Sequence, residues 1–255
     1  MDLDIVFYLS KIANFIGSEW LSAFMLILCY ATMLFLWRIW QVKGIYLYNI
    51  LAVIIANIQV LKMTSFSGMS EPVALGTILF ATTFTASDIL TEHVGGDEAK
   101  QCVKICFAAQ LIMTIFMLLT VVFPTQGDIM GHESGAIINP VQYAMFILFA
   151  PSVRITIASL ISYYISQMVD IYVFKFVSNL TKQKMVWLRF NVASFVSGLV
   201  DNIIFSTLAW VVLAPDPVSF KTLVITYIFG TYFARIAVSI LSTPAIYLAG
   251  ICYKK

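Results

Sequence analysis

The sequence predicts an all-α integral membrane protein with about seven transmembrane helices, a six-helix core plus an N-terminal helix. Two observations carry this prediction. Of 255 residues, 61% are hydrophobic and only 11% are charged, which excludes a water-soluble domain. Seven apolar segments also approach the length of about 20 residues that a helix needs to cross a bilayer. They run over 20–40, 44–61, 72–91, 100–123, 152–177, 187–214 and 222–250.

Two further segments are apolar but do not fit a span. The stretch 3–16 mixes apolar residues with Asp4, Lys11 and Asn14, a pattern typical of a helix on the membrane surface. Residues 124–140 form a loop rich in glycine and acidic groups, and the ten residues 141–150 that follow are too short to cross. We expect 141–150 to be an interfacial or half-inserted helix. Segment 20–40 has no small-residue cleavage site after it and is expected to be retained, not removed as a signal peptide.

The charges between the segments predict the orientation. Lysine and arginine accumulate in cytoplasmic loops, and alternate connections here carry ten of the basic residues. We therefore expect the N-terminus outside and the C-terminus in the cytoplasm. The formal charge is only +2 and there is no basic block, so no direct nucleic-acid binding is expected. The ten basic residues are Arg38, Lys43, Lys100, Lys104, Lys175, Lys182, Lys184, Arg189, Lys254 and Lys255.

Eight charged residues lie within or at the edges of the spans, where a charge is costly unless it is paired or faces water. Asp201 and Arg235 each lie about 20 Å into their helices, so they are a candidate central pair. The eight charges together fit a polar pathway across the membrane. For the charged residues near span ends, the alternative is a structural ion pair or a side chain that reaches the water at the interface. The eight are Lys62, Asp88, Glu92, Arg154, Asp170, Arg189, Asp201 and Arg235.

The sequence gives little support for an enzyme. The four cysteines lie in apolar surroundings without a cluster that could bind a metal, and there is no nucleotide-binding loop. We therefore expect no cofactor and no metal. An intramembrane hydrolase with Asp88 and Asp201 as paired carboxylates is the alternative from this class, although the residues around the two aspartates do not specifically favour it.

Several motifs in order resemble the queuosine-precursor transporter family, also known as a vitamin uptake transporter family. They are ANIQVLK (56–62), ATTFTASDILTE (81–92) with GGDEAK (95–100), PSVRITIASLISYYISQMVDIYVF (151–174), WLRFNVASFVSGLVDNIIF (187–205) and TYFARIAVSILSTPAIYLA (231–249). Two departures are that the family commonly has lysine in place of Arg235 and a glutamine near Gly198. The resemblance implies one transmembrane transporter domain over 1–255, with 1–43 as an additional helix region and 44–252 as the family core.

The resemblance implies uptake of 7-deazaguanine bases, such as preQ0, preQ1 or queuine, across the bacterial cytoplasmic membrane for tRNA modification. The expected partners are this small substrate and the lipid bilayer, with a homo-oligomer left open. A carrier for another vitamin or nucleobase is the alternative. A carboxylate could accept from the base edge, amides could bind its carbonyl and ring nitrogen, and an aromatic ring could stack on it. The candidates are Asn57, Gln59, Asp88, Glu92, Arg154, Gln167, Asp170, Asn191, Asp201, Phe205 and Arg235.

A further hypothesis is an inverted repeat, with the second to fourth spans matching the fifth to seventh. That arrangement would place Asp88 opposite Asp201 near the midplane, between two halves that rock against each other.

Overall fold

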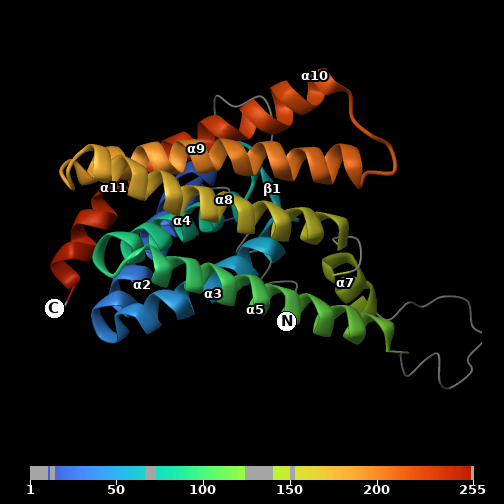
Figure 1. Cartoon of the computed structure of the whole chain (residues 1–255). Helices are drawn as coiled ribbons and strands as arrows, with labels where there is room; N and C mark the ends of the chain where they lie inside the picture. The colour runs from blue at the N-terminus through green and yellow to red at the C-terminus, as the bar shows by residue number, and fades with distance from the viewer. Residues whose placement is uncertain (1–10, 12–14, 67–72, 124–139, 150–152, 254–255) are drawn as a thin grey trace, which may run out of the picture.

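The computed structural model describes residue 11 and residues 15–66, 73–123, 140–149 and 153–253. Long helices lie roughly along one direction and are packed side by side (Figure 1). The elements are α2 (Ser18–Trp40), α3 (Val42–Gln59), β1 (Met63–Thr64), β2 (Val73–Ala74), α4 (Gly76–His93), α5 (Gly96–Val122), α7 (Pro140–Phe149), α8 (Val153–Leu180), α9 (Val186–Thr207), α10 (Phe220–Thr222) and α11 (Gly230–Cys252). Two π-helical segments, η1 (Leu208–Val212) and η2 (Leu223–Phe229), extend α9 and precede α11.

The all-α membrane fold is confirmed. Within the described part of the chain, six helical stretches are long and apolar enough to cross a membrane: Ser18–Trp40, Val42–Gln59, Gly96–Val122, Arg154–Leu180, Val186–Val212 and Phe220–Cys252. Large apolar side chains such as Phe24, Phe35 and Phe116 point outward, whereas Asp88 and Asp170 are fully buried. A hydrocarbon surface around a polar interior is the arrangement that lipid as a solvent favours. The chain is therefore a multi-pass membrane protein.

The predicted third span, α4, differs from the other six. Fourteen of its 18 residues are buried, and it packs against α2, α3, α5, α8 and α11. Its threonines, serine and acidic residues make it less apolar than a lipid-facing span, so it is not among the six stretches. A helix that is enclosed by other helices can carry this many polar groups because protein, and not lipid, surrounds it. The count of seven spans is therefore not confirmed.

The ends of the helices form two distinct ends of the molecule. One end, here called the basic end, holds the turns at Gln41, Gly95 and Lys182 and the end of α11. There the Trp37 Nε1–H donates to the carbonyl oxygen of Ala249 at 2.9 Å, and the Trp37 and Tyr253 rings stack with centroids 5.4 Å apart. Most of the basic residues that predicted a cytoplasmic side belong to these connections, so the structure gathers them at one end.

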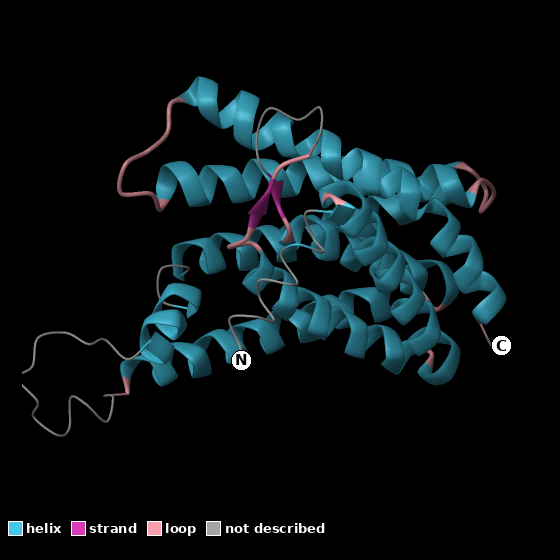
Figure 2. Ribbon diagram, turned by 180° about the vertical axis from the view of Figure 1, so that it is seen from behind, coloured by secondary structure: helices cyan, strands magenta, loops and turns pink. Residues whose placement is uncertain are grey.

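The opposite end holds the start of α8 and the connection over 213–219. The antiparallel hairpin β1–β2, in which Met63 pairs with Ala74, lies between the two ends of the molecule. Figure 2 shows this short hairpin in magenta among the helices. The structure has a helix, α7 (Pro140–Phe149), where the sequence predicted one over 141–150. The predicted surface helix over 3–16 lies almost entirely outside the described residues, as does the loop over 124–139.

Gly76 lets α4 approach α3 closely at the start of α4. A Cβ atom on Gly76 would lie 2.3 Å from the carbonyl oxygen of Ala56, which is far inside van der Waals contact and involves backbone that cannot swing away. Gly198 on α9 is different, because an added Cβ would lie 3.9 Å from the nearest atoms.

We predict that Gly76→Ala lowers the melting temperature of the detergent-solubilised protein, because the added methyl group forces α3 and α4 apart. Gly198→Ala is the matched control. It should leave the melting temperature unchanged or raise it slightly, since alanine is favoured over glycine inside a helix by about 1 kcal/mol. Equal melting temperatures for Gly76→Ala and the native protein would contradict the predicted close approach.

Candidate functional site

A cavity of about 430 Å³ lies between the α3–hairpin–α4 segment and helices α8, α9, η2 and α11. This volume is within the range of small-molecule binding sites. The lining is mostly apolar with a few polar groups from separate helices. It comprises Ala56, Asn57, Val60, Met63, Val73, Ala74, Gly76, Thr77, Phe80, Ile155, Ser159, Asp201, Asn202, Phe205, Ser206, Trp210, Thr226, Tyr227, Gly230, Thr231 and Arg235.

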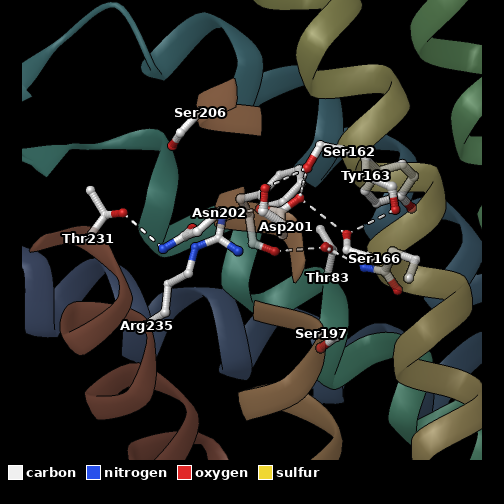
Figure 3. Close-up of polar contacts among 12 residues, drawn as sticks. Thr83, Ser162, Tyr163, Ser166, Ser197, Asp201, Asn202, Ser206, Thr231 and Arg235 are labelled. Carbon is white, nitrogen blue, oxygen red and sulfur yellow. Dashed lines mark hydrogen bonds and ion pairs between the residues drawn. The ribbon is translucent and has the colours of Figure 1, made fainter. Parts of the chain in front are cut away.

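An ion pair between α9 and α11 forms the floor of the cavity. The Arg235 Nη2 atom lies 2.5 Å from Asp201 Oδ2, and the two side chains are only 15% and 3% exposed. Figure 3 shows Arg235 reaching toward Asp201, with Ser162 and Ser166 of α8 beyond it. These two hydroxyls donate to Asp201 Oδ1 at 2.5 and 3.2 Å. The carboxylate is therefore held by three side chains from two other helices, which fixes its position.

Arg235 also divides two empty spaces. Its guanidinium carbon lies 5.4 Å from the centre of the Phe80 ring, a cation–π contact that adds a second restraint. A void of about 20 Å³, bounded in part by Ser194, Ser239 and Ser242, lies on another side of the same arginine. Movement of Arg235 would therefore connect the cavity to polar groups nearer the basic end.

The cavity walls offer acceptors and flat aromatic surfaces. The Asn202 Nδ2 group donates to the Ile228 carbonyl at 3.0 Å and to Thr231 Oγ1 at 2.9 Å. The Asn57 Nδ2 group donates to the carbonyl of Val53 at 2.9 Å. The amide oxygens of both asparagines accept from no described residue, so they are available to a ligand.

The two π-helical segments shape the outer wall of the cavity. Trp210 on η1 and Tyr227 on η2 stack with ring centroids 5.0 Å apart, and the backbone N–H of Val218 donates to the Trp210 carbonyl at 3.1 Å. A π-helical turn holds one more residue than an α-helical turn, so it displaces side chains from the helical register, and such turns are frequent at functional sites.

Four of the eleven residues expected from the sequence line the cavity: Asn57, Asp201, Phe205 and Arg235. The other seven lie elsewhere. Glu92 pairs with Arg189 at the basic end, and Arg154 is exposed at the opposite end, where it donates to the Leu213 carbonyl at 3.3 Å. Gln59, at the end of α3, has a buried Oε1 atom without a partner among the described residues.

Two of the expected amides link helices to one another. Gln167 on α8 accepts from Ser87 at 2.8 Å and donates to Thr83 at 3.0 Å, which ties α8 to α4. Asn191 on α9 donates to Thr243 on α11 at 3.0 Å. These contacts are the interhelical hydrogen bonds that polar side chains commonly form in membrane proteins.

Asp88 lies against Asp170 and not opposite Asp201. Asp88 is on α4 and Asp170 on α8, and both are fully buried. The carboxylate pair that the hydrolase alternative requires, Asp88 with Asp201, is thus not the pair that the fold brings together.

Three residues that line the cavity were not among the site residues expected from the sequence: Asn202, Ser206 and Trp210. They recur every four residues along the end of α9 and η1, which is the spacing of one helix face. This spacing can be read from the sequence. The three residues continue, toward the opposite end, the polar face of α9 that carries Asn191, Ser194, Gly198 and Asp201.

Residues 74–249 match the model of a family described as "Putative vitamin uptake transporter". The chain belongs to this family. It is also 28% identical over 236 residues to a Bacillus subtilis (strain 168) protein named "Probable queuosine precursor transporter", with 92% of this chain and 95% of that protein covered. No solved structure matches the chain.

Membership of the vitamin uptake transporter family supports a transporter and not an enzyme. The matched region begins at the hairpin and includes every helix that contributes to the cavity except α3. The ion pair and most of the cavity lining therefore lie in the part of the chain that matches the family.

We predict that Asp201→Asn lowers the melting temperature of the purified protein by several degrees, because it leaves the Arg235 charge without its partner. Loss of one member of a buried ion pair costs on the order of 3 kcal/mol. The double variant Asp201→Asn, Arg235→Gln removes both charges and should recover part of the loss. Asp97→Asn is the matched control, since the Asp97 side chain is 94% exposed. A double variant less stable than the single variant would contradict the pairing.

Proposed function

We propose that this chain imports queuosine precursors, 7-deazaguanine bases such as preQ0, preQ1 or queuine, for the modification of tRNA. The observation that carries the proposal is the 430 Å³ cavity closed by the Asp201–Arg235 pair and bordered by amide oxygens and aromatic rings. The family match and the name of the Bacillus subtilis relative support the same substrate class.

The polar groups of the cavity complement a guanine-like edge. Such an edge presents a ring N–H and an exocyclic amino group as donors, beside a carbonyl acceptor. The amide oxygens of Asn57 and Asn202 can accept from these donors, and the Arg235 guanidinium has further N–H groups for the carbonyl. Asp201 holds Arg235 in place and is itself an acceptor next to the cavity. Phe205 and Phe80 supply flat faces on which the base can stack.

The position of the cavity supports an uptake carrier that faces outward. Its lining includes Met63 and Ala74 of the hairpin, and also Trp210 and Tyr227 of the π-helical segments, which lie toward the end opposite the basic end. Because basic connections favour the cytoplasm, we place the basic end and the C-terminus inside and the N-terminus outside, in a bacterial cytoplasmic membrane. The cavity is then on the external side of the ion pair, ready to receive the base.

We predict that the native chain restores queuosine to tRNA in cells that can neither make nor import the precursor and are supplied with limiting 7-deazaguanine bases. Asp201→Asn should fail to restore it at equal expression, because Arg235 loses its position. The readout is the shift of queuosine-containing tRNA on a boronate gel. Asp97→Asn, which changes an exposed carboxylate at the basic end, should restore queuosine as the native chain does.

Absence of restoration by a correctly inserted native chain with every precursor would overturn the queuosine assignment. It would favour another vitamin or nucleobase as the substrate of the same cavity. Restoration by Asp201→Asn would support the substrate class but would show that the Asp201 carboxylate is not needed for uptake.

We predict that an impermeant maleimide added to intact cells labels a cysteine introduced as Asp216→Cys and does not label Lys184→Cys. Both native side chains lie in exposed turns, at the opposite end and the basic end respectively. Cys29, Cys102 and Cys106 are buried. Labelling of the native chain measures the background from its own cysteines. The reverse labelling pattern would show that the orientation is wrong.

A further inference from the structure

The acidic side chains of the described helices outnumber their basic partners in the interior. Asp88 and Glu92 lie on α4, Asp170 on α8 and Asp201 on α9, at the interfaces between these helices. Two arginines lie among them. Arg189 pairs with Glu92 and Arg235 pairs with Asp201. Asp88 and Asp170 have no basic partner among the described residues.

The Asp88–Asp170 pair is enclosed by protein. Both residues have no exposed surface, and the carboxyl groups lie against each other. One oxygen of Asp170 accepts from Ser197 Oγ at 2.7 Å, while its other oxygen and both oxygens of Asp88 have no hydrogen-bond partner among the described residues. Two adjacent carboxylates without a cation cannot both remain charged in such a place, whereas a proton between them gives one of them a donor.

The acid pair is connected to the cavity floor through α8 and α9. Ser166, which donates to Asp201, lies one helical turn from Asp170 on α8. Ser197, which donates to Asp170, lies one turn from Asp201 on α9. Each helix therefore supplies a serine to the aspartate of the other, so a change of charge at Asp170 acts on the contact that positions Asp201 and Arg235.

The other titratable groups near the pair are identified by element. On α4, Glu92 lies one turn from Asp88 toward the basic end, and its side chain is 19% exposed. On α9 and α11 the charged neighbours are Arg189, Asp201 and Arg235, each already paired. On α5 the buried titratable side chains are the thiols of Cys102 and Cys106. The acids Asp201, Asp170, Asp88 and Glu92 thus form a series from the cavity to the basic end.

We propose that Asp88 and Asp170 form a proton-binding site that couples import of the base to inward movement of a proton. This inference rests on the proposed function. In each cycle the pair takes a proton from the external side when the base occupies the cavity and releases it to the internal side after the base has left. Base and proton move in the same direction, and no covalent bond changes.

The test uses the full-length protein in liposomes and whichever of the tritiated bases preQ0, preQ1 and queuine gives counterflow. Counterflow is exchange of labelled for unlabelled base and needs no gradient. With a more acidic exterior the native protein should accumulate the base, up to about tenfold for each pH unit per coupled proton. A base concentration that is higher outside than inside, at equal pH, should acidify the liposome interior, as an internal pH indicator reports. A sodium gradient at equal pH should give no accumulation.

Asp88→Asn and Asp170→Asn keep the shape of the side chain but cannot bind a proton. Each should retain counterflow, lose the accumulation driven by pH and lose the internal acidification. Asp97→Asn is the matched control and should behave as the native protein. If the asparagine variants do not fold, Asp170→Glu keeps an ionisable group at an altered position and should shift the external pH at which uptake is half-maximal.

Absence of counterflow by the native protein with all three bases would overturn the proposed function. Counterflow without any response to pH, accumulation driven by sodium, coupled transport by both asparagine variants, or an unshifted pH dependence in Asp170→Glu would each overturn the proton site while leaving the transporter intact.

Discussion

The ion pair between Asp201 and Arg235 is the interaction on which the arrangement of the last three long helices depends. A lone charge at this depth in a membrane is costly, so each member requires the other. The aspartate lies on α9 and the arginine on α11, and the two serines that hold the carboxylate lie on α8. One pair thereby fixes three helices at a common level, forms the cavity floor and separates the cavity from the smaller void. The same pair that stabilises the bundle therefore lies where a ligand would arrive.

The pairing of Asp201 with Arg235 could be predicted from the sequence, because the depth of a residue along a helix can be calculated from its residue number. Asp201 and Arg235 fall at similar depths in antiparallel helices, and the structure pairs them. The direction in which a helix face points cannot be calculated in the same way. The inverted-repeat hypothesis would place Asp88 opposite Asp201, whereas the packing of α4 against α8 brings Asp88 beside Asp170. The register changes at η1 and η2, which bring Trp210 and Tyr227 together, also depend on contacts between helices distant in sequence.

The difference between a pathway residue and a structural residue likewise depends on packing. Gln167 and Asn191 have residue types suited to base recognition, but in this structure their donors and acceptors bind neighbouring helices. Glu92 and Arg189 form the structural ion pair that was the alternative for charges near span ends. The burial of α4 has a similar origin. Its composition is apolar enough to suggest a span, and only the surrounding helices show that it faces protein on nearly all sides.

The contact between Trp37 and Ala249 joins residues that are 212 positions apart, and this separation constrains the order of biogenesis. The ribosome synthesises α2 long before the end of α11, so α2 must reside in the bilayer without its partner while the intervening helices insert. Its many exposed apolar side chains suit it to that interval. Trp37 can meet the end of α11, and Tyr253 can stack on it, only after α11 has been synthesised. Truncation before Ala249 would therefore leave α2 inserted but without the hydrogen bond that Trp37 makes to α11.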